Sequence, residues 1–357
     1  MIQSVRIRNF KGIRDVEVGL ERLTVFVGPN ASGKTSILQG LDLLVTFATK
    51  RIISDDLIRQ SMMHYGFFHR KFNQLELSCT TTVGNVRFIL SPGESESSHT
   101  PNGQLDRSIE AMELGDTSQE WRKISEFPNV EQSVGRSRLF RFDAAQMAVP
   151  SSGVGVRLAD NGSGLASTLA FMALNQPENF LLVQQELKEI VPSIERIRFE
   201  RTQASKKAAG TILESIIFDV KGEAGVSTYG VSEGTLLVLG LLTAMMNQHR
   251  PNLILLDDLD RGLHPLAQRN MISLLRKVLK HQPDLQIIAT THSPYLVDSL
   301  CPEEVRMTTL REDGTVACGR LDEHPDFPRW RDEFLPGELW SMFGEKWVAD
   351  RAPEVAR

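Results

Sequence analysis

The eight residues Gly28–Thr35, GPNASGKT, match the pattern GxxxxGK[ST] in full. A compact apolar run, LTVFV, precedes them, and SILQGLDLLVTFATK, with apolar residues at helical spacing, follows. In the order strand, tight loop, helix, the loop amides and the positive end of the helix dipole converge on one point. The pattern therefore predicts a loop that binds a polyphosphate, the alternative being an ordinary glycine-containing turn.

Two side chains of this loop have chemistry suited to a magnesium nucleotide. Lys34 can reach the terminal phosphates, and the hydroxyl of Thr35 can ligate Mg²⁺. The predicted phosphate contacts are Asn30, Ala31, Ser32, Gly33, Lys34, Thr35 and Ser36.

Two further apolar runs end in polar residues. LILL is followed by Asp257 and Asp258, and QIIATT is followed by His292. Asp257 is predicted to hold the Mg²⁺ shell, Asp258 to orient the attacking water, and His292 to hydrogen-bond the γ-phosphate or that water. The alternatives are a solvated acidic turn and a histidine with only a structural role. The carboxyl ends of parallel strands meet at one edge of a sheet, which is where ligands bind.

The remaining pattern indicates the elements that position these residues. Residues 2–27 predict three strands, and residues 75–90 predict a hairpin whose arms are separated by Gly84 and Asn85. The polar stretch 91–104 predicts a mobile loop. Apolar strands alternate with helices from about residue 232 onward, which favours an α/β fold with a largely parallel sheet covered by helices on both faces.

The composition bounds the class of protein. Of 357 residues, 41% are hydrophobic and 24% charged, which is typical of a soluble globular chain. No apolar run is long enough to span a membrane, so we expect a cytoplasmic protein without a membrane partner. The three cysteines fit neither a disulfide framework nor a zinc site.

The net charge of −5 argues against a surface that binds nucleic acid everywhere. A solvated strand edge is the favoured interpretation of the one basic cluster, and nucleic-acid binding is the alternative. The cluster consists of Arg196, Arg198, Arg201, Lys206 and Lys207.

Four segments together resemble a known family. GPNASGKT, VSEGT, LILLDDLDRGLHP and THSPYLVDSL occur in the order of the Walker A, signature, Walker B with D-loop, and switch-histidine motifs of ABC-type ATPases. The chain looks most like the RecF, SMC and OLD-like branch, often described as AAA-family ATPases. Its opening, IRNFKGIRDVEV, is similar to the start of that branch, which makes Lys11 a candidate nucleotide contact. The resemblance covers most of residues 1–57 and 140–300.

The resemblance implies a single ABC-type head over residues 1–357, with a largely parallel sheet, an antiparallel β subdomain and a helical signature subdomain. Its expected parts are an N-terminal lobe with Walker A (1–57), an inserted β and loop subdomain (58–139), a helical signature subdomain (140–250), the Walker B to switch-histidine segment (251–300) and a tail (301–357). No long coiled coil is expected between the Walker motifs, and no nuclease domain after the switch histidine.

The tail offers one aromatic face. Near-helical spacing joins Leu339, Trp340, Phe343 and Trp347. We expect this face to fold back on the core, and docking of a partner is the alternative.

The family also implies a homodimer. Ser232 and Gly234 of VSEGT would contact the γ-phosphate of ATP bound to the other subunit, so that two chains enclose two Mg-ATP. A serine N-cap at a helix N-terminus offers a hydroxyl, amides and a positive dipole to an anion. The plainer interpretation of VSEGT is a capped helix.

The sequence departs from the family pattern at three places. Asp258 stands where many relatives have glutamate, so its carboxylate is one methylene shorter and hydrolysis is expected to be slow. The signature is VSEGT, where LSGGQ is usual. A Q-loop glutamine is not evident, and Gln146 is the candidate, as a ligand of Mg²⁺.

The predicted function is an ATP switch. ATP and Mg²⁺ are the expected cofactors, Asp258, His292 and Lys34 the catalytic residues, and ADP and phosphate the products. The resemblance implies a separate effector, such as a nuclease or toxin, in prokaryotic defence. The alternative is a RecF-like DNA-repair ATPase that clamps duplex DNA, and a membrane transporter's nucleotide-binding subunit fits less well.

Overall fold

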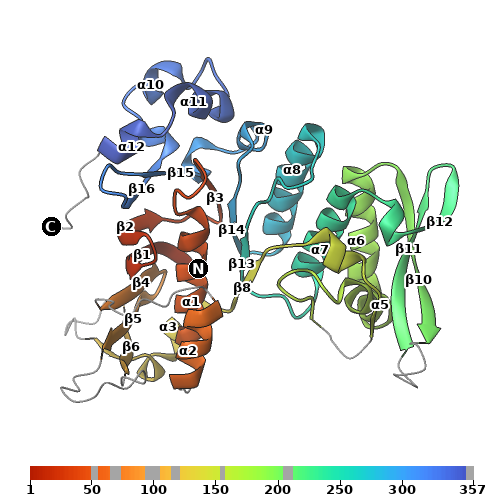
Figure 1. Cartoon of the computed structure of the whole chain (residues 1–357), viewed down its shortest axis with the longest axis horizontal. Coiled ribbons are helices and arrows are strands. Elements are labelled where there is room, and N and C mark those ends of the chain that lie inside the picture. Colours follow the sequence, from red (N-terminus) through yellow and green to blue (C-terminus); the bar gives the residue numbers. More distant parts are fainter. Residues whose placement is uncertain are drawn as a thin grey trace. The chain divides into compact units, whose positions relative to one another are not determined.

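The computed structural model describes residues 1–49, 55–64, 74–92, 105–113, 121–152, 157–203 and 212–350. The chain divides into two compact units (Figure 1). Unit 1 comprises Met1–Arg138 and Asp284–Arg357, and unit 2 comprises Leu139–Pro283. Within the described ranges, none of the helices has the length and apolar character needed to cross a membrane.

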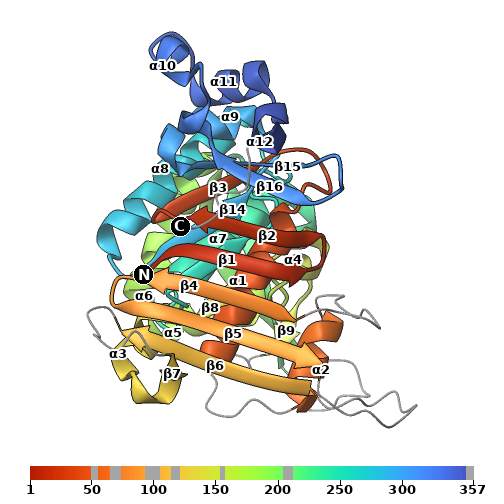
Figure 2. The same cartoon turned by 90° about the vertical axis from the view of Figure 1, so that its left-hand side faces the viewer.

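An antiparallel sheet forms one layer of unit 1. Its strands lie side by side in the order β2-β1-β4-β5-β6-β7 (Figure 2). Their bounds are β1 Ile2–Phe10, β2 Ile13–Gly19, β4 Leu75–Thr81, β5 Gly84–Pro92, β6 Leu105–Glu113 and β7 Arg122–Lys123. Because β4 pairs with β1, the strands of segment 58–139 continue the sheet that the N-terminal strands begin.

The hairpin predicted over residues 75–90 is present, with its turn earlier than expected. Gly84 and Asn85 belong to β5, and Asn85 lies opposite Thr80 of β4. The turn is closed by Thr81, whose hydroxyl accepts hydrogen bonds from the amides of Val83 and Gly84. A threonine side chain therefore stabilises the turn, at a place where the sequence had suggested a turn formed by glycine and asparagine. Most of the predicted mobile loop, 93–104, lies outside the described residues.

A second sheet of unit 1 contains β3 Leu23–Val27, β14 Gln286–Thr290, β15 Val305–Leu310 and β16 Val316–Arg320. Within the unit their order is β16-β15-β3-β14. Strand β3 is parallel to both β14 and β15, whereas β16 is antiparallel to β15. Every residue of β3 and β14 is buried, as expected for apolar parallel strands that are covered on both faces.

Helix α1, Lys34–Ala48, packs against β14 and also against β1, β4 and β5. It therefore lies between the two sheets of unit 1. The other helices of the N-terminal part are α2 Asp55–His64, the 3₁₀ turn η1 Ile124–Glu126 and α3 Pro128–Val134.

The tail of unit 1 folds back on its own unit, as the favoured interpretation expected. After the short helix α9 Pro294–Val297, the tail contains η4 Pro302–Glu304, η5 Leu321–Glu323, α10 Phe327–Trp330, α11 Pro336–Phe343 and α12 Lys346–Asp350. Gly344, with φ 61°, separates α11 from α12. Leu339 is buried, the ring of Phe343 stacks on His324 at 3.8 Å, and Trp347 meets His324 edge-on.

Unit 2 combines a helical layer with an antiparallel sheet, β10-β11-β12, in which β9 also pairs with β11. The alternation of helices with an apolar strand that the sequence predicted from about residue 232 onward is present, and further helices and strands precede it (Figure 1). Their bounds are β8 Ser137–Phe140, which starts at the end of unit 1, α4 Ala144–Ala148, β9 Ser151–Ser152, α5 Leu165–Asn175, α6 Pro177–Ile190, β10 Ile194–Gln203, β11 Ile212–Val220, β12 Glu223–Ser227, η3 Thr228–Gly230, α7 Glu233–Met246, β13 Leu253–Leu256 and α8 Pro265–His281.

Candidate functional site

The loop between β3 and α1, residues Gly28–Thr35, rests directly on β15 and β16. Gly28 has φ 140°, and a Cβ there would lie 2.1 Å from the carbonyl oxygen of Thr308. Gly33 has φ 95°, and its Cβ would lie 2.6 Å from a methyl of Val316. Both glycines are therefore required by backbone conformation and by close approach together.

A hydroxyl pair fastens the same loop to β15. The buried Ser32 Oγ lies 2.6 Å from Thr308 Oγ1. Thr308 Oγ1 in turn lies 3.1 Å from the carbonyl oxygen of Val27, to which it donates. Since Thr308 uses its proton for Val27, the hydroxyl of Ser32 donates to Thr308.

Lys34 turns its ammonium group back onto the loop. Its side chain is buried, and Nζ donates to the carbonyl oxygens of Gly28 at 2.9 Å and Pro29 at 2.8 Å. Helix α1 begins at this lysine, and Gly33 before it offers no side chain to cap the first amides. An ammonium group and a helix N-terminus without a side-chain cap are thus brought together, which suits an anion.

Of the other predicted phosphate contacts, Asn30 and Ala31 are exposed at the tip of the loop. Thr35 and Ser36 are half-buried in the first turn of α1. The structure therefore places every predicted residue of this motif on one short loop or helix turn.

His292 follows β14 at the same edge of the sheet. Thr290 is in register with Phe26 of β3, and the amide of Thr291 donates to the carbonyl oxygen of Phe26 at 3.0 Å. His292 comes next and is exposed. Since β3 leads into Gly28 just beyond Phe26, the parallel pair delivers the histidine and the loop to one edge.

Lys11 lies in the turn between β1 and β2 and reaches α1. Its φ is 54°, and its Nζ donates to Gln39 Oε1 at 2.5 Å. Burial lowers the pKa of Lys11 from its ordinary value. The structure thus ties this lysine to the helix that carries Lys34 and Thr35.

In unit 2, the carboxylates of Asp257 and Asp258 follow the buried strand β13. Asp257 is buried, its amide donates to the carbonyl oxygen of Phe140, and its Oδ2 lies 3.8 Å from Nε of Arg141. Asp258 has φ 59°, and its carbonyl accepts from the amide of Arg261. A left-handed residue closed by a hydrogen bond three residues on forms a tight turn, which fixes where the second carboxylate points.

Asp257 and Asp258 line a small cavity of about 30 Å³, together with Leu237 and Leu241 of α7. That volume is enough for a water molecule.

The predicted signature caps α7. Ser232 is exposed, and its Oγ accepts a hydrogen bond from the amide of Thr235 at 3.2 Å. A Cβ on Gly234 would lie 2.5 Å from the carbonyl oxygen of Gly262. The glycine is thus required because the segment after Asp258 crosses the start of this helix at close range.

Gln146 is exposed on α4, in unit 2. Asp143 caps α4 by accepting from the amides of Ala145 and Gln146. The segment leaves β8 at Phe140, beside the backbone of Asp257. The structure therefore places Gln146 in the same unit as Asp257, while Thr35 belongs to unit 1.

Two of the three described residues of the basic cluster on β10 form ion pairs. Arg198 pairs with Asp219 at 2.5 Å and Arg201 with Glu214 at 3.1 Å. Lys206 and Lys207 lie outside the described residues. These ion pairs support the interpretation as a solvated strand edge.

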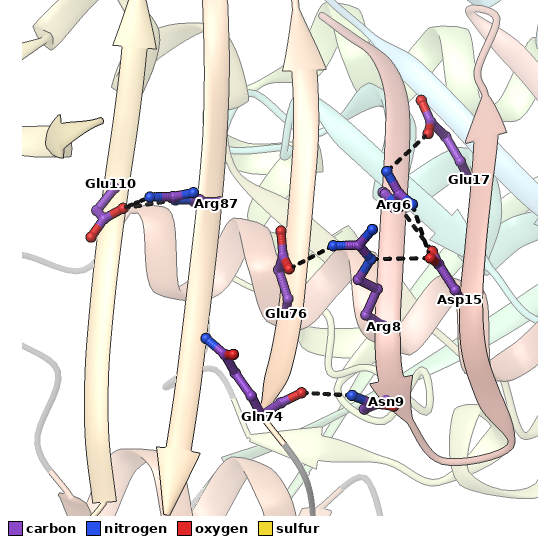
Figure 3. Close-up of polar contacts among 9 residues, drawn as sticks. All are labelled: Arg6, Arg8, Asn9, Asp15, Glu17, Gln74, Glu76, Arg87 and Glu110. Carbon is purple, nitrogen blue, oxygen red and sulfur yellow. Dashed lines mark hydrogen bonds and ion pairs between the residues drawn. The ribbon is translucent and has the colours of Figure 1, made fainter. Parts of the chain in front are cut away.

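The arginines on the antiparallel sheet of unit 1 are paired in the same way (Figure 3). Arg6 and Arg8 both contact Asp15, and Arg87 pairs with Glu110 at 2.5 Å. This sheet face therefore alternates in charge and presents no continuous basic stripe among its described residues.

Sequence reasoning missed several supporting residues. Thr308 and Val316 form the platform under the loop, Gln39 holds Lys11, and Arg141 faces Asp257. Only Arg141 carried a local signal, since it directly follows an apolar run that ends in Leu139 and Phe140. Within the described residues, no group of three or more histidine, cysteine, aspartate or glutamate side chains is arranged to hold a metal by itself.

Comparison with known proteins gives a consistent result. Residues 23–298 match the family model described as "AAA domain, putative AbiEii toxin, Type IV TA system". The chain is 24% identical to an ATP/GTP phosphatase of Helicobacter pylori, over 92% of this chain and 95% of that protein. It is also 24% identical to the Septu protein PtuA of Bacillus thuringiensis, over 90% of this chain and 79% of that protein.

Among solved structures, an Smc head domain from Pyrococcus furiosus, bound to the C-terminal domain of ScpA, superposes with a TM-score of 0.56. The match covers 93% of this chain and 99% of that one, at 14% identity. At this identity the likeness shows the fold alone, and that fold is the one expected from the sequence.

Proposed function

The chain belongs to this AAA-domain family and is an ABC-type ATPase of the RecF, SMC and OLD branch, and on that premise we propose that it is an ATP-dependent switch. Two copies close around two Mg-ATP and, in doing so, gate a separate effector. The observation that supports this most directly is the loop Gly28–Thr35, with two sterically required glycines and a buried lysine. An ordinary glycine-containing turn would need neither two glycines in close contact with neighbouring strands nor a buried lysine.

In the proposed site, each residue has one task. Lys34 and the loop amides hold the β- and γ-phosphates, and the hydroxyl of Thr35 together with Asp257 holds Mg²⁺. Magnesium prefers one or two carboxylates plus phosphate oxygens and water, so it does not need a cluster of protein ligands. Gln146 would join that shell through its amide oxygen.

Asp258 and His292 are proposed to act on the attacking water and the γ-phosphate. Asp258 orients the water, and His292 donates to the phosphate charge that develops. Because the aspartate is one methylene shorter than glutamate and is held in a left-handed turn, its reach is limited. We therefore expect slow hydrolysis and a long-lived ATP-bound form, which suits a switch better than a motor.

The proposed dimer depends on the start of helix α7 in unit 2. Ser232 is exposed at the start of α7, and the close approach of Gly234 to Gly262 fixes that helix start beside the turn that follows Asp258. A second copy would supply the phosphate that this helix N-terminus is suited to receive. Lys11 is proposed as an additional nucleotide contact from the turn between β1 and β2, where it binds Gln39 of α1.

The effector and the defence role rest on likeness to relatives. The similarity to Septu protein PtuA extends over most of both chains. We propose that the effector is a separate protein with nuclease or toxin activity, and that nucleotide state controls its release.

The test compares three variants by light scattering with Mg-ATP. Asp258→Asn retains the phosphate loop and is expected to double in mass on addition of ATP. Lys34→Ala is expected to remain at the mass of the nucleotide-free protein. Ser232→Arg is expected to bind ATP in a fluorescence assay and yet fail to double, because the bulky cation blocks the partner's phosphate. Equal masses for all three variants, with and without ATP, would exclude the proposed closure.

One observation keeps the DNA clamp as a second candidate. Over 103 residues, 28% of this chain and 26% of that protein, the chain is 29% identical to the DNA replication and repair protein RecF of Trichodesmium erythraeum. The paired arginines of β10 and of the unit 1 sheet count against it. An ATP-dependent, salt-sensitive shift of duplex DNA would favour the clamp, and no shift at low salt would favour the switch.

A further inference from the structure

A cavity of about 340 Å³ opens in unit 1 between β1 and β2 on one side and β15 and β16 on the other. This volume is at the lower end of the range for small-molecule pockets. No residue of the phosphate loop lines the cavity, so it is separate from the proposed ATP site. Four arginines and three carboxylates line it, an excess of one positive charge.

Arg306 of β15 is the most deeply buried of these arginines, with 2% of its surface exposed. Its Nε donates to the carbonyl oxygen of Gly19 at 2.7 Å, and its Nη1 donates to that of Glu303. In the part of the chain that the structure describes, no carboxylate lies within ion-pair distance of it. Burial lowers its pKa from the ordinary value, because the charged form loses solvation. A buried guanidinium that has backbone partners but no counter-charge is costly unless an anion joins it.

The third nitrogen of this guanidinium, Nη2, is available on the cavity side. It makes no hydrogen bond to the described residues, and it lies beside Gly19, where an added Cβ would be 4.0 Å away. Gly19 also lines the cavity. Because Arg306 itself lines the cavity, Nη2 is the nitrogen of this buried cation that is left for a ligand.

Arg311 is a second cation of the cavity without an ion-pair partner among the described residues. It is half-buried, and its Nη1 donates to the carbonyl oxygen of Val316 at 3.0 Å. The other two arginines are neutralised: Arg320 pairs with Asp322, and Arg6 pairs with Asp15 (Figure 3). Uncompensated positive charge is thus restricted to Arg306 and Arg311.

We propose that this cavity binds a ligand through a carboxylate group held by Arg306 and Arg311. The planar donors of a guanidinium match the two oxygens of a carboxylate. The carboxylates of Asp15, Glu17 and Glu323 also line the cavity, and their negative charge opposes a phosphate dianion more strongly than a singly charged carboxylate. The carboxylate could belong to a small organic acid or to the C-terminus of a peptide.

The experiment is isothermal titration calorimetry on the full chain at constant ionic strength. The probes are propionate, an N-acetylated tetraglycine with a free C-terminus, its C-terminal amide, and inorganic phosphate. At least one carboxylate probe is expected to saturate with a Kd of about 10 mM or tighter. Phosphate and the amidated peptide are expected to bind at least tenfold more weakly.

Matched variants connect that binding to the cavity. Arg311→Gln removes one cation that makes a single backbone hydrogen bond, and a loss of affinity of tenfold or more is expected. Arg306→Gln should abolish binding, with circular dichroism as the check on its folding. Arg14→Gln, an exposed arginine outside the cavity, is the control and should bind like the wild type.

Binding of propionate alone identifies a small acid, and binding of the free peptide alone identifies a protein terminus. Absence of saturation with every carboxylate probe overturns the proposal. Equal affinity for phosphate, or an Arg311→Gln variant that binds as tightly as Arg14→Gln, overturns it as well.

Discussion

Replacing Gly28 by alanine tests whether the phosphate loop depends on close contact with β15. A Cβ at this position would lie 2.1 Å from the carbonyl oxygen of Thr308, which belongs to the backbone and cannot rotate away. The φ of 140° is also outside the range that alanine readily adopts, which costs about 1–3 kcal/mol. Overpacking adds about 1–3 kcal/mol. We therefore expect Gly28→Ala to lower the free energy of unfolding by about 2–6 kcal/mol, or to lift the loop from β15.

Alanine variants of two other glycines in unit 1 serve as controls that separate the cost of backbone conformation from the cost of overpacking. Gly314 has φ 75° and open space around its Cβ position, so Gly314→Ala should cost only about 1 kcal/mol. Gly12 has open space and no positive φ, so Gly12→Ala should be close to neutral. Comparing the three variants therefore distinguishes the steric contribution of Thr308 from the cost of backbone conformation.

The assay is urea unfolding together with binding of a fluorescent ATP analogue. Gly28→Ala should lose both stability and nucleotide affinity, with affinity reduced tenfold or more, whereas Gly314→Ala and Gly12→Ala should retain wild-type affinity. If Gly28→Ala matched Gly314→Ala in both measurements, the contact between the loop and β15 would not be the constraint that we infer.

Three further outcomes are expected. Asp258→Asn should reduce ATP hydrolysis by about a hundredfold or more in a phosphate-release assay, while its unfolding midpoint stays near that of the wild type, because asparagine tolerates φ 59°. Ser232→Ala should lose about 1 kcal/mol of unfolding free energy with the N-cap of α7, and an unchanged urea midpoint would contradict the role of this cap. Burial raises the pKa of Asp15, but hydrogen bonds from Arg6 and Arg8 and their charges outweigh it, so the pKa lies below its ordinary value. The stabilisation from Asp15 is therefore present above pH of about 4 and lost as pH falls through the folded pKa, so the difference in urea midpoint between wild type and Asp15→Asn should shrink on acidification.

The residues of the proposed ATPase cycle are divided between the two units of the chain. Lys34, Thr35 and His292 belong to unit 1, whereas Asp257 and Ser232 belong to unit 2. The phosphate loop and the histidine are fixed to each other through the parallel pair β3 and β14. In the same way, the start of α7 is fixed to the turn after Asp258 through Gly234 and Gly262.

The amino-acid sequence by itself determined the phosphate loop, the two carboxylates and the capped helix. These features are local: a strand, a tight turn and a helix follow one another within about a dozen residues, and their glycines, serine and apolar runs have a direct conformational meaning. The runs LTVFV, LILL and QIIAT are short and largely apolar, which favours buried strands, and each one is a strand in the structure.

Only the tertiary structure decided how distant segments meet. The sequence divided residues 1–57 from 58–139, whereas the pairing of β1 with β4 joins strands of both segments in one sheet. It contained no sign that Thr308 and Val316 support the phosphate loop, or that Arg306 is buried without a counter-charge. Strand pairing and the burial of an arginine depend on contacts between residues far apart in the chain, which local spacing does not encode.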